Sequence, residues 1–350
     1  MGLFDGIKRL LGVQSRDAER RRQREALEAF WAFWVEREAE FGEATGKTVP
    51  EATKAAISAA VGAIHPDLGW CIGSGLTKDH SFTLTGQGDP ELRVIAERWR
   101  ALAPEVRFEL FTARPAEPET KIMGLEMRAD GGPTLAYAEL AVGIERDDDR
   151  RLLHLDLHHP ALREMPADER AHLGILMLDH ALGEDAVERW IGQIDFVEAP
   201  VEDAVDLVGL RAAVAELGEV EAVWVVADYE DAGYPMILMT CPSLKRWDHP
   251  RLDTCCEVIF GYRGGADRLP TEDLQDLFGA VEDELLALVE NIEEAEHFAT
   301  LTGGHARRHF IYVDGESMAG ARIQAWGDGK GRGIRVNLEE DPGWDLLPRV

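Results

Sequence analysis

Three polar residues near the middle of the chain alternate with leucines and could hold a metal ion: His154, Asp156 and His158. Side chains two residues apart on a β-strand point to the same face, so these three would lie together on one face of a strand. Imidazole nitrogens and carboxylate oxygens are ligands for zinc, iron or manganese, and such a site would suit a metal-dependent hydrolase. Metal sites usually draw ligands from several elements, so the pattern favours the solvated face of a half-buried strand.

A second candidate for chemistry is the run from Gly315 to Ala319, which is close to the nucleophile elbow of serine hydrolases. In that fold the acid and the histidine follow the serine along the chain, but the last histidine here, His309, precedes Ser317. Ala319 also stands where the motif has its second glycine. We therefore interpret Ser317 as a residue that starts a helix.

Other catalytic and cofactor motifs are missing from the sequence. It contains no phosphate-binding Gly-x-x-x-x-Gly-Lys-Ser/Thr loop, no Gly-x-Gly-x-x-Gly between a strand and a helix, and no His-Glu-x-x-His. Carboxylates are so frequent that no pair of them stands out. The sequence thus predicts no catalytic residue, no cofactor and no metal site, and it favours a role without catalysis.

The charge of the chain restricts its partners. The sequence has 66 acidic and 37 basic residues, a net charge of -29. This charge repels phosphate groups, so we expect no direct binding to nucleic acid and instead a protein partner with a basic surface. The favoured function is a protein-interaction or regulatory module. An acidic inhibitor of a basic toxin or nuclease and the metal-dependent hydrolase stay open as alternatives, as does the oligomeric state.

Three segments gather basic or aromatic residues in this acidic chain and are the predicted contact surfaces. They are the turn from His305 to His309 with Arg307 and Arg308, the loop around Trp247 with Lys245, Arg246 and His249, and residues 1–24. The last segment has seven basic residues and an apolar helical face. It could touch an anionic membrane surface weakly, dock into a partner's groove, or pack on the protein itself.

The cysteines and the hydropathy indicate the cellular setting. Four irregularly spaced cysteines give neither a disulfide framework nor a paired zinc motif. Cys255 and Cys256 are neighbours, so on a strand we expect one core thiol and one exposed thiol. No secretory signal and no apolar run of transmembrane length is visible, so the expected location is cytoplasmic.

The length of 350 residues exceeds what one core usually supports and predicts two tandem α+β domains, each an antiparallel sheet covered by helices. We place them at residues 25–200 and 201–350, after the basic segment 1–24, with the boundary in the acidic, proline-containing stretch Glu198 to Asp206. The expected helices are Glu25 to Phe41, Pro50 to Ile64, Pro90 to Leu102, Ala167 to Leu182 and Val205 to Leu217. The expected strands are Gly69 to Gly73, Ser81 to Thr85, Val106 to Thr112, Lys121 to Met127, Thr134 to Ile144, Leu152 to His158, Ile191 to Val197, Val220 to Ala227 and Met236 to Cys241.

The side chains allow a closer interpretation of two regions, the first helix and the run that begins at Leu269. In the first helix Leu27, Phe30, Trp31 and Trp34 recur at helical spacing, which predicts a buried aromatic stripe. From Leu269 onward the pattern reads helix, strand, turn, strand, helix, strand. Thr271 would cap the first of these helices, and the glycines after Thr302 would form the turn of a hairpin.

This C-terminal run resembles the bacterial family called domain of unknown function 695. The residues that carry the resemblance are the helix with Val281-Glu282-Asp283, the turn Thr302-Gly303-Gly304, the strand Phe310-Ile311-Tyr312 and the final Asp341-Pro342-Gly343-Trp344. More distantly, the layout is similar to regulator of ribonuclease activity B, an acidic α+β protein that acts by binding an enzyme. The resemblance covers roughly the last third of the chain. It implies a bacterial intracellular protein with a ferredoxin-like layout in this region, and it assigns no catalytic residue.

The net charge gives a first testable prediction. Because like charges repel one another across the folded surface, added salt should stabilise the fold by screening them. Thermal melting at rising concentrations of sodium chloride measures this directly. A melting temperature that falls as salt approaches physiological strength would contradict the prediction.

Overall fold

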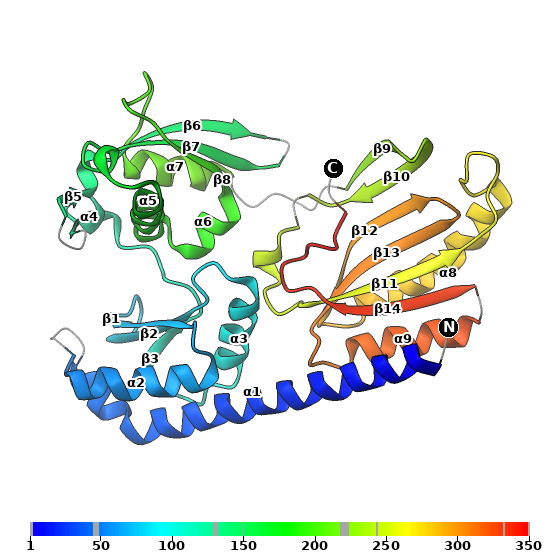
Figure 1. The fold of residues 1–350 in the computed structure, drawn as a ribbon, viewed down its shortest axis with the longest axis horizontal. Helices are drawn as coiled ribbons and strands as arrows, with labels where there is room; N and C mark the ends of the chain where they lie inside the picture. Colours follow the sequence, from blue (N-terminus) through cyan, green and yellow to red (C-terminus); the bar gives the residue numbers. More distant parts are fainter. Residues whose placement is uncertain are drawn as a thin grey trace. The chain divides into compact units, whose positions relative to one another are not determined.

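The computed structural model describes residues 3–44, 49–128, 132–148, 150–217, 224–242, 244–331 and 333–348. The chain divides into two compact units, Met1–Arg114 and Pro115–Val350, each built of helices packed on β-sheets (Figure 1). The α+β fold class predicted from the sequence is therefore confirmed. Within the described ranges, no helix combines the length and the hydropathy needed to cross a membrane.

In its described residues, the first unit packs three helices on a three-stranded sheet. Strands β1 and β2 are antiparallel, whereas β2 and β3 are parallel, because α3 carries the chain back across the sheet between them. The elements are α1 (Leu3–Ala44), α2 (Glu51–Ile64), β1 (Gly69–Gly73), β2 (His80–Thr85), α3 (Pro90–Ala101) and β3 (Phe108–Phe111).

The predicted aromatic stripe of the first helix is confirmed as the core of this unit. Phe30 and Trp34 are 2 % and 0 % exposed and stack with their ring centroids 5.8 Å apart. Trp31 stacks on Trp99 of α3, and its indole Nε1 donates to the carbonyl oxygen of Trp99 over 2.8 Å. A buried indole needs such an acceptor, so this bond fixes where α1 lies on α3.

Helix α1 continues across the predicted boundary at residue 24. The helix runs without a break from Leu3 to Ala44, so residues 3–24 are the first part of the same helix that supplies the aromatic core. The side chains of residues 3–17, which include the predicted apolar face from Leu3 to Leu11, lie outside the described residues.

The second unit begins with a core of helices packed on the sheet β6-β7-β8. Strands β7 and β8 are parallel and are joined through α5 and α6. The stretch expected as a strand at Lys121 to Met127 begins within α4 and becomes a strand only at Glu126. The stretch expected at Thr134 to Ile144 is interrupted by the 3-10 turn Tyr137–Glu139. The elements are α4 (Glu119–Ile122), β4 (Glu126–Arg128), β5 (Thr134–Ala136), β6 (Ala141–Asp147), β7 (Leu152–His158), α5 (Ala167–Leu182), α6 (Glu184–Trp190), β8 (Ile191–Phe196) and α7 (Leu207–Leu217).

Helix α7 shows that the predicted domain boundary at residues 200 and 201 must be corrected. Leu207 and Leu210 of α7 are fully buried in the same core as Val142 of β6. The backbones of Val142 and Val205 also exchange two hydrogen bonds of 2.8 and 2.9 Å. The acidic, proline-containing stretch before α7 is thus a connection within one core. The composition of such a stretch indicates that it is exposed, but it does not indicate on which core the following helix packs.

The rest of the second unit is a six-stranded antiparallel sheet with the order β14-β11-β13-β12-β10-β9. The segment from β11 to β14 has the element order β-α-β-β-α-β and the strand order of a ferredoxin-like layout, as the resemblance implied. The strand β11 itself was not among the elements predicted from the sequence. The hairpin β9-β10 extends this sheet beyond β12 (Figure 1). The elements are β9 (Val225–Asp231), β10 (Tyr234–Thr240), β11 (Thr254–Gly261), α8 (Glu272–Glu290), β12 (Ala295–Gly303), β13 (Ala306–Val313), α9 (Ala319–Lys330) and β14 (Ile334–Glu340).

Both faces of this sheet are covered along β11. Cys256 packs with the residues of α8 and α9, whereas Cys255 packs on the opposite face with Trp344 of the C-terminal tail. Their exposed fractions are 0 % and 2 %, so the expectation of one exposed thiol is wrong. The side chains alternate between the faces as predicted, but neither face is solvated. Burial raises the pKa of the Cys255 thiol to about 12, which keeps it protonated.

The placement of α7 can be tested by matched substitutions. Leu210→Ala should lower the free energy of unfolding of the core around β7 by about 2 to 5 kcal/mol, because it removes a fully buried side chain. Leu277→Ala, at a residue of α8 that is 60 % exposed, should change the stability by less than about 0.5 kcal/mol. Amide hydrogen exchange of β7 and α5 measures the difference. Equal exchange in the two variants would show that α7 does not belong to this core.

Candidate functional site

The three polar residues of the predicted metal site lie on one face of β7, as their spacing indicated. They are half-buried and alternate with the buried leucines of the strand. The Nδ1 atom of His154 accepts a hydrogen bond of 2.9 Å from the backbone amide of Gln193, and His158 Nδ1 donates to the carbonyl oxygen of Val197 over 3.2 Å. Both imidazoles are therefore bonded to the backbone of the strand β8 and its end.

Their spacing along the strand also separates them. At a rise of about 3.3 Å per residue, the Cα atoms of His154 and His158 are about 13 Å apart, too far to bind one ion together. In the part of the chain that the structure describes, no group of three or more histidine, cysteine, aspartate or glutamate side chains is arranged to hold a metal.

Ser317 occupies the turn that precedes α9. Its Oγ atom donates to the carbonyl oxygen of Asp314 over 2.8 Å and accepts from the backbone amide of Ala319 over 3.1 Å. These are local bonds that stabilise the start of a helix, which is the role that the sequence indicated.

The predicted basic contact surface at the hairpin β12-β13 is largely internal. Arg307 lies 3.2 Å from a carboxylate oxygen of Glu282 on α8, and Arg308 lies 3.5 Å from Glu257 on β11. The side chain of His309 is completely buried. The cations of this turn neutralise acids of their own sheet and helix, so they do not form a free basic patch.

The second predicted contact surface, the Trp247 loop, also makes contacts within its own unit. Lys245 Nζ donates to the carbonyl oxygen of Arg150 over 3.0 Å, and Asp248 forms an ion pair of 2.9 Å with Arg189 of α6. Burial, together with the nearby cations Arg151 and Arg189, lowers the pKa of Lys245. The loop therefore serves packing between α6 and the chain that leads to β11.

A buried polar network lies under α8, and the sequence analysis did not anticipate it. Glu282 Oε1 is 3.4 Å from His309 Nε2, and His309 Nδ1 is 3.2 Å from Thr300 Oγ1. The same hydroxyl lies 3.1 Å from His297 Nε2, which is also 3.0 Å from the carbonyl oxygen of Ala299. The network thus runs from α8 across β13 to β12.

The partners fix the direction of the hydrogen bonds in this network. A carbonyl oxygen only accepts, so the Nε2 atom of His297 must carry the proton that faces Ala299 and Thr300. The Thr300 hydroxyl can then donate to His309 Nδ1, which leaves the proton of His309 on Nε2, next to the carboxylate of Glu282. Both imidazoles can then be neutral, and the Nε2 atom of His309, 3.4 Å from Glu282 Oε1, is the buried nitrogen of this chain of contacts that makes no hydrogen bond among the described residues.

Burial accounts for the neutral state of these histidines. It lowers the pKa of His297 from 6.5 to about 4 and lowers the pKa of His309 well below 6.5. For His309 the neighbouring His297 and Arg307 act in the same direction. Burial raises the pKa of Glu282, although Arg307 opposes this shift. The network is buried beneath α8 and positions the helix on the sheet.

One end of this network reaches the surface at β9. Trp224, which precedes β9, stacks on His297 with a centroid distance of 5.2 Å and is 40 % exposed. The register of the sheet places His309, Thr300, Met239 and Val226 in one row on the face that α8 covers. Their exposure rises along this row, from 0 % at His309 and 2 % at Thr300 to 66 % at Val226.

The helices therefore leave the β9 end of the sheet uncovered. Helix α8 packs on β12, which β10 separates from β9. Helix α9 packs on β14, at the opposite edge of the sheet from β9. We call the exposed residues of this end the β9 surface. It comprises the apolar residues Trp224, Val225, Val226 and Tyr229 and the acidic residues Asp228, Glu230 and Asp231.

The sequence predicted a strand at Val220 to Ala227, whereas β9 runs from Val225 to Asp231, so this surface was missed. Residues 220–223 of the predicted strand lie outside the described residues. The available signal was the tight turn at Ala232 and Gly233 followed by the apolar run of β10. With that turn, the acidic stretch Asp228 to Asp231 belongs to a hairpin strand. A strand with this many charges is typical of a sheet edge.

Comparison with known proteins adds no relative: the chain matches no protein-family model, no curated protein and no solved structure. The resemblance of the C-terminal region to domain of unknown function 695 consequently stays a prediction.

The buried histidine network predicts how stability depends on pH. Between pH 6.5 and about 4 the unfolded chain binds a proton at His297 that the folded chain does not, so stability should fall as the pH falls. The raised pKa of Glu282 has the opposite effect and is common to all variants compared. His297→Gln should reduce the slope of unfolding free energy against pH by about 1 kcal/mol per pH unit in this range.

Thr300→Val provides the matched control. It removes a hydrogen bond from the same network without removing a titrating group, so it should lower stability at every pH while the slope stays as in the wild type. Urea unfolding across the pH range gives both quantities. If His297→Gln and Thr300→Val leave the same slope, the titration of His297 does not control stability.

Proposed function

We propose that this protein binds another protein through β9, which accepts an extended basic segment of the partner as an additional strand. The observation that carries the proposal is the exposed terminal strand of the six-stranded sheet. Among the described strands β9 has a single neighbour, β10, and the hydrophobic residues Val226 and Tyr229 on its two faces are 66 % and 43 % exposed.

The backbone of a terminal strand offers a row of N–H and C=O groups along its free edge. An incoming strand pairs with these groups, and its alternate side chains then lie on the two faces of the sheet. On β9 those side chains would cover Val226 on one face and Tyr229 on the other. The half-buried Ile237 and Met239 of β10 extend the apolar area on the face of Val226.

The acidic charge of β9 and of the whole chain favours a partner strand with basic residues. Asp228, Glu230 and Asp231 lie on the strand itself, and the whole chain carries a net charge of -29. A second copy of this chain paired along β9 would bring two acidic strands together, which is destabilising. A strand with lysine or arginine between apolar residues complements both features and would also be steered toward the surface.

The metal-dependent hydrolase has weaker support. Its residues His154 and His158 bond to backbone groups and lie about 13 Å apart along one strand. Binding through β9 requires no rearrangement of the fold.

A random peptide library displayed on phage tests the proposal with the purified full chain as bait. Selection should enrich peptides in which basic and apolar residues alternate. Fluorescence anisotropy with an enriched peptide should then show at least tenfold weaker binding to the variant Asp228→Lys with Glu230→Lys, a change of about 1.4 kcal/mol.

The control variant is Asp273→Lys with Asp276→Lys, which makes the same change in charge at exposed residues of α8. It should retain most of the affinity. Equal weakening by both variants would show that only the net charge matters, and enrichment of peptides without basic residues would overturn the choice of partner.

A further inference from the structure

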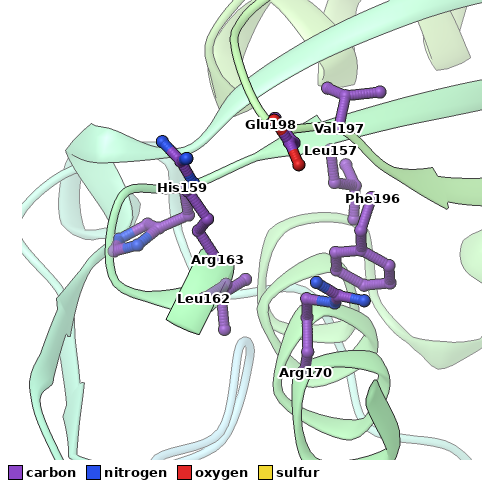
Figure 2. A pocket seen from close by; sticks show the side chains of 8 residues that line it. All are labelled: Leu157, His159, Leu162, Arg163, Arg170, Phe196, Val197 and Glu198. Atoms are coloured by element: carbon purple, nitrogen blue, oxygen red, sulfur yellow. The ribbon is translucent and has the colours of Figure 1, made fainter. Parts of the chain in front are cut away.

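A second surface feature, independent of β9, is a pocket of about 120 Å³ in the first core of the second unit. It lies between the end of β8, the 3-10 turn η2 (Leu162–Glu164) and the first turn of α5 (Figure 2). Cavities of about 150 Å³ can hold a molecule the size of benzene, so this pocket fits a ligand of about six non-hydrogen atoms.

Two arginines line this pocket, and neither has an acidic partner among the described side chains. Arg170 of α5 is half-buried, and its Nε atom is buried without a hydrogen-bond partner. Neither Arg170 nor Arg163 forms an ion pair within the described part of the chain. In contrast, Arg93, Arg146, Arg189, Arg246, Arg307 and Arg308 all do.

The unpaired arginines are notable in a chain with 66 acidic residues. A half-buried guanidinium group whose Nε lacks an acceptor has an unmet hydrogen bond, and carboxylate oxygens satisfy guanidinium groups best. Phe196 holds the Arg170 side chain in place, with the guanidinium carbon 5.4 Å from the ring centroid (Figure 2). The position of the donor is therefore set before a ligand arrives.

The remaining wall of the pocket defines the rest of the ligand. Leu157, Leu162 and Phe196 provide apolar surface, and Glu198, which is exposed, lines the same pocket as Arg163 (Figure 2). A simple carboxylate would bring its negative charge close to Glu198. A ligand that also carries an ammonium group turns this repulsion into an attraction.

Long-range electrostatics favours the same ligand. A net charge of -29 repels anions from the surface but acts little on a molecule without net charge. We propose that this pocket binds a small zwitterion of the α-amino acid type. Arg170 and Arg163 bind its carboxylate, Glu198 binds its ammonium group, and the apolar wall accepts a short side chain.

Isothermal titration calorimetry of the full chain tests this proposal with alanine, propionate and ethylamine as probes. Propionate lacks the ammonium group and ethylamine lacks the carboxylate, so both should bind at least tenfold more weakly than alanine. Glu198→Gln should weaken the binding of alanine and strengthen that of propionate, because it removes the partner of the ammonium and the repulsion of the carboxylate together. Arg170→Gln should weaken alanine binding at least tenfold.

Arg128→Gln, at an exposed arginine of β4 outside the pocket, is the control and should leave alanine binding unchanged. Glu198 is exposed, so its substitution tests the pocket even if Arg170→Gln does not fold. Equal affinities for alanine and propionate, or the absence of binding by all three probes, would overturn the proposal. Neither result would bear on the binding of a basic strand at β9.

Discussion

The organisation of the C-terminal region depends on one constraint: its sheet has two apolar faces, and both must be shielded from water. Helices α8 and α9 cover one face, and the C-terminal tail with Trp344 covers the other. The tail is fixed there by the indole of Trp344, which donates to the carbonyl oxygen of Leu252 over 2.7 Å. Because the two helices pack at β12 and β14, the hairpin β9-β10 extends past the cover and keeps apolar side chains exposed.

The buried polar network follows from the same arrangement. Under α8, the row of residues across the sheet includes His309 and Thr300, whose polar groups have lost contact with water. Each must be paired inside the protein, since an unpaired buried polar group costs about 1 to 3 kcal/mol. The network pairs the Thr300 hydroxyl, His309 Nδ1 and His297 Nε2, whereas His309 Nε2 lies 3.4 Å from Glu282 without a hydrogen bond. It ends at Trp224, which stacks on His297 and is 40 % exposed.

Because acidic residues outnumber basic ones in this chain, most cations are expected to have an acidic partner. Several arginines of the second unit are held by carboxylates of neighbouring elements, as Arg307 is by Glu282 and Arg189 by Asp248. Such pairs bind segments of the fold together and leave the surface acidic, which is the charge that a basic partner would meet. Against this background, the pocket lined by Phe196 contains two arginines, Arg163 and Arg170, that form no ion pair within the described residues, and the ligand proposed for this pocket is inferred from them.

The sequence by itself determined the elements whose patterns are local. The strands β1 and β7 and the helix α5 lie at their predicted residues, and the aromatic stripe of α1 is core. The elements from α8 to β14 follow the predicted order, whereas the strand β11 that completes the ferredoxin-like layout was not predicted. The tertiary structure alone decided which core α7 joins, that both Cys255 and Cys256 are buried, and that the basic hairpin is neutralised internally. It also decided that β9 is uncovered. The physical reason is that periodicity tells which side of an element is apolar, whereas burial and charge pairing depend on what other parts of the chain place against that side.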